Sequence, residues 1–341
     1  MTEKTEALVI PAIRQVELRR IEIPSVQSGE VRIRTLHTLL SMGTEMSVAT
    51  GQRMENARFP FVPGYQGVGR IEACAADVTD FHEGDIVLFL GGRVLPPNHA
   101  VWGAHQGTVV CSTYGLFRCP NELHPRIACL ATLFAVGMHG VELAEVKPTD
   151  VVVVIGHGLI GAGAAQAARA RGAFVIVSEP NAVRRRLAAE NAADVVVDPT
   201  AETVEGILPT HLPPGSDGAD VVIESTGVGK LLDGAMRLVR TKGKFVYQGW
   251  YSGQVSYYFM TPHAKELTAF YPTGHAGPYW EGVAGLRQSQ MKEAAVRLVA
   301  RGIFKVEPYL SHMISLAKAV EGYQLAMSER RHEIIGMIFD W

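Results

Sequence analysis

The sequence predicts an α/β protein with two parts, a β-rich part at the N-terminus and a doubly wound parallel sheet after it. Three observations predict this architecture. The first third of the chain contains short alternating strands, the middle contains strands that are apolar throughout, and helical segments separate those apolar strands. The chain has 341 residues, of which 47% are hydrophobic and 19% charged, so it has enough apolar material for two cores.

Short strands fill the N-terminal part. Residues 7–36 alternate apolar and polar positions, and the turn-forming stretch PSVQSGE interrupts them. The stretches GVGRIEAC, GDIVLFL and GTVVCS follow the same pattern and are separated by Gly, Asp and Pro. Such short strands with turn signals between them are typical of antiparallel β-structure.

Strands and helices alternate in the middle of the chain. Residues 124–146 have helical spacing, and the next stretch, DVVVVIGHGLIGAGAAQAARARGAFVIVSEP, reads as apolar strand, glycine turn, helix and second apolar strand. Apolar strands of this kind suit a parallel sheet covered on both faces. The alternation continues to about residue 270, and the tail contains the helix candidates 287–301 and 316–327 and a final strand, HEIIGMIFDW.

Composition limits the partners and the compartment. The formal net charge is −2 without long runs of one sign, so neither nucleic acid nor a membrane surface is expected as a partner. No apolar stretch is expected to approach the roughly 18 residues that span a bilayer, and the start lacks a secretory pattern. The four cysteines are scattered without a C-x-x-C pair, which favours reduced thiols in the cytoplasm.

The glycine turn has the pattern G-x-G-x-x-G and predicts a dinucleotide site. Gly156 permits a tight turn, Gly158 lets the backbone approach a pyrophosphate, and Gly161 lets helix and strand pack closely. Leu159 and Ile160 complete the motif at the helix N-terminus, where free N–H groups attract phosphate. The pattern alone is weak, but the strand before it and the helix after it make it strong.

Glu179 is the expected ribose ligand. It stands 23 residues after Gly156 at the end of the second strand, where a carboxylate accepts hydrogen bonds from ribose hydroxyls and repels a 2′-phosphate. This predicts NAD as the cofactor. NADP stays open, because Arg184 and the two arginines after it are able to meet a 2′-phosphate.

The whole chain resembles the medium-chain dehydrogenase/reductase superfamily. The resemblance rests on SMGTE at 41–45, PGYQGVGRI at 63–71, the GHGLIG turn, GADVVIESTG at 218–227 and TKGKFVYQG at 241–249. It implies a GroES-like β-rich catalytic domain made of residues 1–133 and 273–341, and an inserted Rossmann NAD(P)-binding domain, 134–272. It further implies that Thr226 contacts the cofactor, and that the sheet edge near the aromatic stretches 247–260 and 270–280 pairs with a second subunit in a homodimer.

The resemblance also shows what is replaced. Zinc alcohol dehydrogenases of this superfamily place a cysteine ligand where this chain has Met42, a histidine where it has Tyr65, and a third ligand near Ala131 and Thr132. The lobe at 89–119, which in those enzymes has four closely spaced cysteines, has two that are eight residues apart. Zinc needs three or four nitrogen, sulfur or carboxylate donors, so no metal is expected.

Without zinc, hydroxyl groups must stabilise the developing alkoxide. By resemblance, Tyr65 points at the substrate oxygen and Thr44 matches a proton-relaying residue, with Gln66 or Glu45 orienting them. His105 lies in a loop that lines the substrate cleft in relatives and is a candidate proton donor. The alternatives are that Tyr65 only fills the volume of the lost metal and that Glu45 is structural.

The sequence therefore predicts a zinc-independent NAD(P)-dependent oxidoreductase that interconverts a secondary alcohol and a ketone, a small-molecule substrate. Two alternatives stay open. One is a quinone or enoyl reductase of the same fold, although such relatives usually have an asparagine–proline stretch in place of SMGTE. The other is a nucleotide-binding sensor without turnover.

Overall fold

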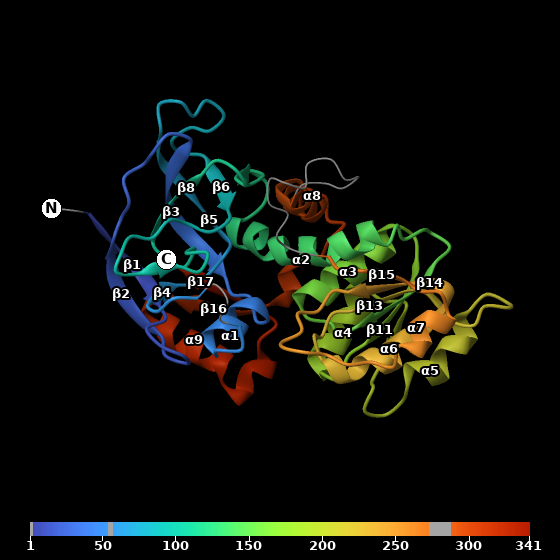
Figure 1. The fold of residues 1–341 in the computed structure, drawn as a ribbon. Coiled ribbons are helices and arrows are strands. Elements are labelled where there is room, and N and C mark those ends of the chain that lie inside the picture. Colours follow the sequence, from blue (N-terminus) through green and yellow to red (C-terminus); the bar gives the residue numbers. More distant parts are fainter. Residues whose placement is uncertain (1–2, 54–56, 273–287) are drawn as a thin grey trace. The chain divides into compact units, whose positions relative to one another are not determined.

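The chain folds into two compact units in the computed structural model, which describes residues 3–53, 57–272 and 288–341 (Figure 1). Unit 1 comprises residues 1–132 and 309–341, and unit 2 comprises residues 133–308. The C-terminal segment thus returns to the first unit, as the resemblance implies. The division differs from the expected domains in one segment, because residues 288–308 group with unit 2.

Unit 1 is built on β-structure. Its strands are β1 (Lys4–Val9), β2 (Glu17–Glu22), β3 (Glu30–Leu39), β4 (Phe61–Val62), β5 (Gly67–Cys74), β6 (Ile86–Phe89), β7 (His99–Ala100), β8 (Thr108–Ser112), β9 (Phe117–Arg118), β16 (Leu310–Ser315) and β17 (Gly336–Asp340). The main sheet has the order β16-β17-β3-β5-β6-β9, with β8 paired to β3. Its pairs are antiparallel except that β16 and β17 run parallel. This confirms the antiparallel prediction for the first third.

Two short helices pack with this sheet. Helix α1 (Thr44–Ala49) begins directly after the SMG turn, and α9 (Ala319–Met327) precedes the last strand. Met46, Tyr323 and Phe339 are buried together in one core cluster with residues of β1 and β4. The packing fixes the start of α1, and with it the side chains of Thr44 and Glu45.

Unit 2 is a doubly wound parallel sheet. Its strands are β10 (Val151–Ile155), β11 (Phe174–Ser178), β12 (Val195–Val197), β13 (Ala219–Glu224), β14 (Val239–Tyr247) and β15 (Thr268–Phe270), and its helices are α3 (Leu159–Ala170), α4 (Ala182–Asn191), α5 (Val204–Ile207), α6 (Leu232–Arg237), α7 (Met260–Ala264) and α8 (Gln288–Ala300). The strand order is β12-β11-β10-β13-β14-β15, and every pair is parallel. Figure 1 shows α3 and α6 on opposite faces of this sheet.

This order places the glycine turn at the switch point. The chain winds outward from β10 in one direction to β11 and β12, and in the other to β13, β14 and β15. Ligands of such sheets bind outside the carboxyl ends of the strands where the order reverses, which is between β10 and β13. The turn that follows β10 lies at that point.

Helix α2 (Pro125–Leu143) corrects one expectation. By length and composition it is apolar enough to cross a membrane, with a mean hydropathy of 1.3 over its best window. Arg126 and His139 interrupt the apolar run in the sequence, whereas the mean hydropathy of a window tolerates them. In the structure 72% of that window is buried, and the core helix of a water-soluble protein gives the same result.

Candidate functional site

In the glycine turn of unit 2, two of the three glycines lie so close to other atoms of the protein that a side chain would not fit. Gly156 has φ of +90°, and a Cβ there would lie 2.7 Å from the Thr226 side chain. A Cβ on Gly161 would lie 2.1 Å from the Gly156 carbonyl oxygen. Both positions therefore need glycine for the fold itself.

At Gly158 the fold itself does not require glycine. Its φ is −74°, which suits any residue, and no atom lies within 4 Å of the place where its Cβ would be. It is the N-cap of α3 and has no side-chain cap, so the first N–H groups of that helix, which include those of Leu159 and Ile160, face this open space. The space and the donors fit a pyrophosphate group.

Sequence reasoning missed Ser225. Its hydroxyl lies 2.8 Å from the Ile155 carbonyl oxygen and 3.0 Å from that of Gly156, so it holds the turn from the neighbouring strand. About 70 residues separate these partners in the sequence. Only the pairing of β10 with β13 brings them together, and no local motif indicates that pairing.

Glu179 is held by backbone donors on both carboxylate oxygens. Oε2 accepts a hydrogen bond from the N–H of His157 at 2.7 Å, and Oε1 accepts one from Asn181 at 2.9 Å. The side chain is buried directly after β11, beside the switch point. An ionised carboxylate has about four acceptor positions, so two remain for ribose hydroxyls.

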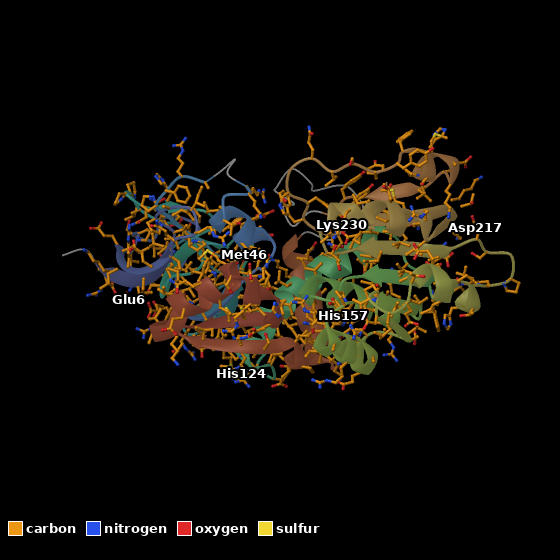
Figure 2. The ribbon with its side chains drawn as sticks, turned by 90° about the horizontal axis from the view of Figure 1, so that it is seen from below. Glu6, Met46, His124, His157, Asp217 and Lys230 are labelled. Atoms are coloured by element: carbon orange, nitrogen blue, oxygen red, sulfur yellow. The ribbon has the colours of Figure 1, made fainter. Side chains whose placement is uncertain are left out.

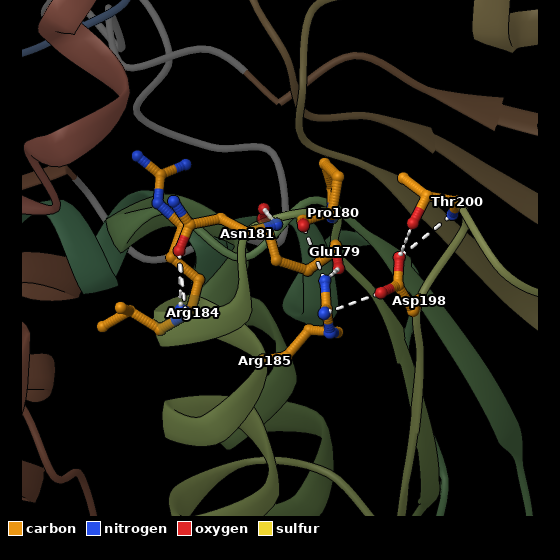
Figure 3. Close-up of polar contacts among 8 residues, drawn as sticks. Glu179, Pro180, Asn181, Arg184, Arg185, Asp198 and Thr200 are labelled. Atoms are coloured by element: carbon orange, nitrogen blue, oxygen red, sulfur yellow. Dashed lines mark hydrogen bonds and ion pairs between the residues drawn. The ribbon is translucent and has the colours of Figure 1, made fainter.

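The three arginines after Glu179 have different roles. Arg185 pairs with Asp198 at 2.6 Å and donates to the carbonyls of Glu179 and Pro180. Arg186 lies near Glu190 on the exposed side of α4. Figure 3 shows the Arg184 guanidinium pointing away from the Asp198 side. Burial, followed by the charge of Arg184, lowers the pKa of His157 to about 3.

Thr226 makes three hydrogen bonds within the protein. Its N–H and its hydroxyl both donate to Oε1 of Glu224, and its Oγ1 accepts from the N–H of Val228 at 3.0 Å. The side chain is exposed. These bonds give Thr226 a role in shaping the loop after β13, and its predicted contact with the cofactor stays a prediction.

In unit 1 the structure brings Tyr65 and Thr44 together. The Tyr65 hydroxyl is hydrogen-bonded with the side chains of Thr44 and Ser41, and its ring lies edge-on to Trp102 with centroids 5.6 Å apart. Burial raises the pKa of Tyr65 well above its ordinary value, the charge of Glu45 adds to this, and the two hydrogen bonds oppose it. The phenol therefore stays protonated at neutral pH and acts as a donor.

Ser41 is a second residue that the sequence reasoning missed. Its side chain is buried and its N–H donates to Oε1 of Glu45 at 2.8 Å. It is the first residue of the SMGTE stretch that the family resemblance singles out. What the sequence lacked was the turn that directs its hydroxyl toward Tyr65.

His105 is fully buried and both of its ring nitrogens have partners. Nε2 lies 2.8 Å from Oε2 of Glu45, and Nδ1 lies 2.8 Å from Oγ1 of Thr38. Thr38 Oγ1 also accepts a hydrogen bond from the Trp341 indole N–H at 2.8 Å. Since an ionised carboxylate only accepts, Nε2 is the donor to Glu45.

This geometry does not fit the proton-donating role that the sequence suggested for His105. The ring has no exposed surface, and Gly64, with φ of +86°, is so close that a Cβ there would lie 2.6 Å from the imidazole. His105 instead fixes Glu45 inside the unit.

The positions that hold zinc in metal-dependent relatives have other partners here. Oε1 of Gln66 accepts a hydrogen bond from the Thr132 hydroxyl at 2.6 Å, and Met42 packs against the core of unit 1. Cys111 and Cys119 are buried, and burial raises the pKa of Cys111 to about 12 and that of Cys119 to about 11. Among the residues that the structure describes, no group of three or more His, Cys, Asp or Glu side chains is able to hold a metal ion.

Comparison with known proteins agrees with this architecture. The family model "Alcohol dehydrogenase GroES-like domain" matches residues 27–137, and the model "Zinc-binding dehydrogenase" matches residues 160–300. L-galactonate-5-dehydrogenase of Escherichia coli K12 is 26% identical over 340 residues, which cover 94% of each chain.

Two solved structures share the fold. A protein of Sinorhizobium meliloti 1021, described as a zinc-binding dehydrogenase and bound to NADP, has a TM-score of 0.81 at 20% identity and covers 99% of this chain and 100% of its own. An alcohol dehydrogenase of Escherichia coli CFT073 in complex with NADH has a TM-score of 0.82 at 18% identity and covers 99% of each chain.

Both family models and the full-length relative agree with the order of elements along the chain, in which the sequence of unit 2 is inserted into that of the β-rich unit 1. The chain belongs to the medium-chain dehydrogenase/reductase superfamily of NAD(P)-dependent oxidoreductases.

Proposed function

We propose that this chain is a zinc-independent dehydrogenase that prefers NAD and interconverts a secondary alcohol and a ketone. The observation that supports this most is the Tyr65 hydroxyl, hydrogen-bonded with Ser41 and Thr44, at the position of a zinc ligand in metal-dependent relatives. One relative is named L-galactonate-5-dehydrogenase, and this similarity favours a hydroxylated substrate for this chain.

The chemistry of the side chains argues against zinc. Met42, Tyr65 and Thr132 offer a thioether and two hydroxyls in place of thiolate and imidazole, and zinc binds such donors poorly. The residues do not fit the metal that the family model's description implies. The proposed reaction therefore has no step through a metal.

In the reduction direction, Tyr65 donates a hydrogen bond to the carbonyl oxygen. Bound NADH would supply the hydride to the carbonyl carbon, and the Tyr65 phenol would stabilise the negative charge that the C=O π electrons place on oxygen. The oxygen then takes a proton, which passes through the Tyr65, Ser41 and Thr44 hydroxyls from water. The balance is ketone plus NADH plus one proton to alcohol plus NAD⁺.

Glu45 and His105 act on this pair as positioning residues. Oε1 of Glu45 holds the N–H of Ser41, and Oε2 is held by His105. The buried Glu45–His105 pair thereby fixes the turn from which Ser41 and Thr44 reach Tyr65. It also keeps a negative charge near the phenol, which favours the protonated, donating form.

The preference for NAD rests on Glu179. A buried carboxylate beside the adenosine ribose accepts from hydroxyls and repels a 2′-phosphate. Arg185 and Arg186 are engaged by Asp198 and Glu190, which leaves Arg184 as the single arginine of the three that extends toward the glycine turn.

We further propose a cytoplasmic homodimer. Strand β15 is at the edge of its sheet and its first two residues are exposed. Large apolar side chains near it are also exposed, among them Tyr258, Phe259 and Tyr271. A second copy pairing along this edge would cover both the strand and the apolar side chains. The predicted cluster at 270–280 lies mostly outside the described residues.

Metal content and substrate class test the proposal together. The purified protein is analysed for zinc, and secondary alcohols, ketones, quinones and enones are screened with both nicotinamide cofactors before and after treatment with a chelator. We expect zinc far below one equivalent and alcohol–ketone turnover that the chelator does not change. One equivalent of zinc with activity lost on stripping would contradict the proposal. Turnover of carbon–carbon double bonds alone would favour an enoyl reductase.

A further inference from the structure

A fully buried carboxylate, that of Glu224, stands at the carboxyl end of β13. Its Oε1 accepts hydrogen bonds from the N–H and the hydroxyl of Thr226, and its Oε2 accepts from the N–H of Gly227 at 3.1 Å and from the Tyr251 hydroxyl. Two donors on each oxygen fill the roughly four acceptor positions of an ionised carboxylate. Glu224 is thus fully used inside unit 2.

These donors belong to two different loops. Thr226 and Gly227 follow β13, whereas Tyr251 follows β14. Burial, and then the charge of Glu224, raises the pKa of Tyr251 far above its ordinary value, so its hydroxyl stays a donor. The carboxylate therefore joins the two loops through their side chains.

The backbones of the two loops also touch. A Cβ on Gly249 would lie 2.3 Å from the Gly227 nitrogen, and a Cβ on Gly227, which has φ of +70°, would lie 2.2 Å from the Trp250 carbonyl oxygen. In addition, the Glu224 carbonyl oxygen accepts from the N–H groups of Gln248 and Gly249 at 2.9 and 2.8 Å. Glycine at both contact positions lets the loops meet, and Glu224 then fixes them.

The place of these loops in the sheet suggests what they serve. A dinucleotide lies across the point where the strand order reverses, here between β10 and β13. Glu179 marks the adenosine side, at the end of β11. The other half of the cofactor, which contains the nicotinamide, therefore extends over the ends of β13 and β14, where the Glu224 loops are.

We infer that Glu224 is a positioning residue for the nicotinamide half of the cofactor, because its carboxylate locks the loops after β13 and β14 to each other. It does so through Thr226 and Tyr251 without touching the cofactor itself. This role does not depend on whether the enzyme uses zinc or on which alcohol it oxidises.

Binding measurements with two nucleotides test the inference. ADP-ribose contains the adenosine and pyrophosphate parts of NAD⁺ without the nicotinamide, so the Kd values for both, measured by titration calorimetry, separate the two halves. If the wild type prefers NADP⁺, that cofactor and 2′-phospho-ADP-ribose are used. In Glu224→Gln the amide NH₂ replaces one carboxylate oxygen, so its hydrogens face at least two of the four donors and those hydrogen bonds are lost. We therefore expect the Kd for NAD⁺ to rise about ten- to a hundredfold, while that for ADP-ribose changes little.

Two further variants sharpen the result. Tyr251→Phe removes one donor and keeps the carboxylate, so we expect the same selective effect at about three- to tenfold. Asp217→Asn is the matched control, because Asp217 accepts from the N–H and hydroxyl of Thr241 in the same way at the amino end of β13. Figure 2 shows Asp217 at the opposite end of unit 2 from His157 and Lys230. The ratio of the two Kd values is expected to stay unchanged in this control.

Three results would overturn the inference. Equal weakening of NAD⁺ and ADP-ribose in Glu224→Gln and Tyr251→Phe would make the carboxylate a general support of the unit. Unchanged binding in both variants would remove any role in the cofactor site. A shift of the ratio in the Asp217→Asn control would show that the effect is not specific to the carboxyl ends of the strands. Because Tyr251→Phe is a small change, it decides the question even if Glu224→Gln does not fold.

Discussion

We propose that Tyr65 acts through its hydroxyl, and the groups around it determine the protonation state of that hydroxyl. Burial and the nearby Glu45 charge both oppose ionisation, so the phenol is held as a donor. Ser41 and Thr44 give its oxygen hydrogen-bonding partners through which a proton is able to leave or arrive. A side chain with this surrounding is suited to polarising a carbonyl and unsuited to acting as a base.

The residue-scale prediction follows from this. We expect Tyr65→Phe to lower kcat/KM for ketone reduction about 10²–10³-fold, as is typical for the loss of one donor to a developing alkoxide. The Kd for NADH is expected to stay unchanged, because Tyr65 belongs to unit 1 and the glycine turn to unit 2. Steady-state kinetics and cofactor titration measure both quantities.

Tyr114→Phe is the control, since Tyr114 is an exposed tyrosine of the same unit. The raised pKa adds a second check, because the wild type should show no loss of rate from tyrosine ionisation up to about pH 10. Activity of Tyr65→Phe close to that of the wild type would mean that the ring only fills volume.

At this scale the sequence located residues better than it described their surroundings. The resemblance predicts Tyr65 and Thr44 at one site, and in the structure their side chains are hydrogen-bonded to each other. His105 was misjudged because the sequence does not reveal burial. Its partners Thr38 and Glu45 are 67 and 60 residues away in the sequence, and no local pattern connects them to it.

The strand–turn–helix element of unit 2 was the clearest signal in the sequence, and it contains three glycines with two different tasks. Gly156 and Gly161 are needed because the protein's own atoms occupy the space of a Cβ, whereas the space beside Gly158 is open. This contrast distinguishes glycines that the fold requires, Gly156 and Gly161, from Gly158, where we propose that the open space receives a ligand.

The element-scale prediction uses that contrast. Gly158→Ala has no steric conflict in the protein, so we expect a free energy of unfolding that is unchanged or about 0.4–1 kcal/mol higher. The added methyl group would occupy the pyrophosphate space, and we expect cofactor affinity to fall about ten- to a hundredfold. Thermal unfolding without cofactor and calorimetric titration with it measure the two effects.

Gly161→Ala is the matched comparison. Its Cβ would press on the Gly156 carbonyl oxygen, so this variant is expected to lose stability even without cofactor. If Gly158→Ala bound the cofactor as tightly as the wild type, the open space would not be the pyrophosphate site.

The sequence predicted this element because its pattern is local, with an apolar strand, glycines at fixed spacing and a helix of small residues. Ser225 and Glu224 were not found, since each acts on residues of another strand or loop. The alternation of strands and helices and the family resemblance predict a doubly wound sheet but not its strand order. Local motifs do not state which strands become neighbours.

For the whole molecule, the sequence predicts a discontinuous first domain, 1–133 with 273–341, and the contacts group the chain into residues 1–132 with 309–341 and residues 133–308. Residues 288–308 group with unit 2, where the side chain of Gln166 bonds the backbone of Lys305 in both directions and Phe134 contacts Phe304. The Gln166–Lys305 pairing joins residues 139 positions apart. Contacts of this range leave no trace in a single sequence.

The prediction at this scale concerns assembly. We expect the wild type to elute with twice the mass of the 37.0 kDa chain in size-exclusion chromatography with light scattering. Phe259→Glu places a charge on an exposed apolar side chain near the edge strand, so it should shift the protein toward the monomer.

Tyr114→Glu changes an aromatic residue of similar exposure in unit 1 and is the control for nonspecific effects. A monomeric wild type at micromolar concentration would refute the dimer. So would a Phe259→Glu variant that remains dimeric together with the control.

Glu179 has a consequence for how this enzyme is able to change over evolutionary time. Its carboxylate accepts hydrogen bonds from the amides of His157 and Asn181, so the residue that we propose selects the coenzyme also braces the chain around it. A lineage drifting toward the phosphorylated coenzyme would have to supply substitute acceptors for those amides before giving up the acid. Anyone redesigning the enzyme would have to make the changes in the same order.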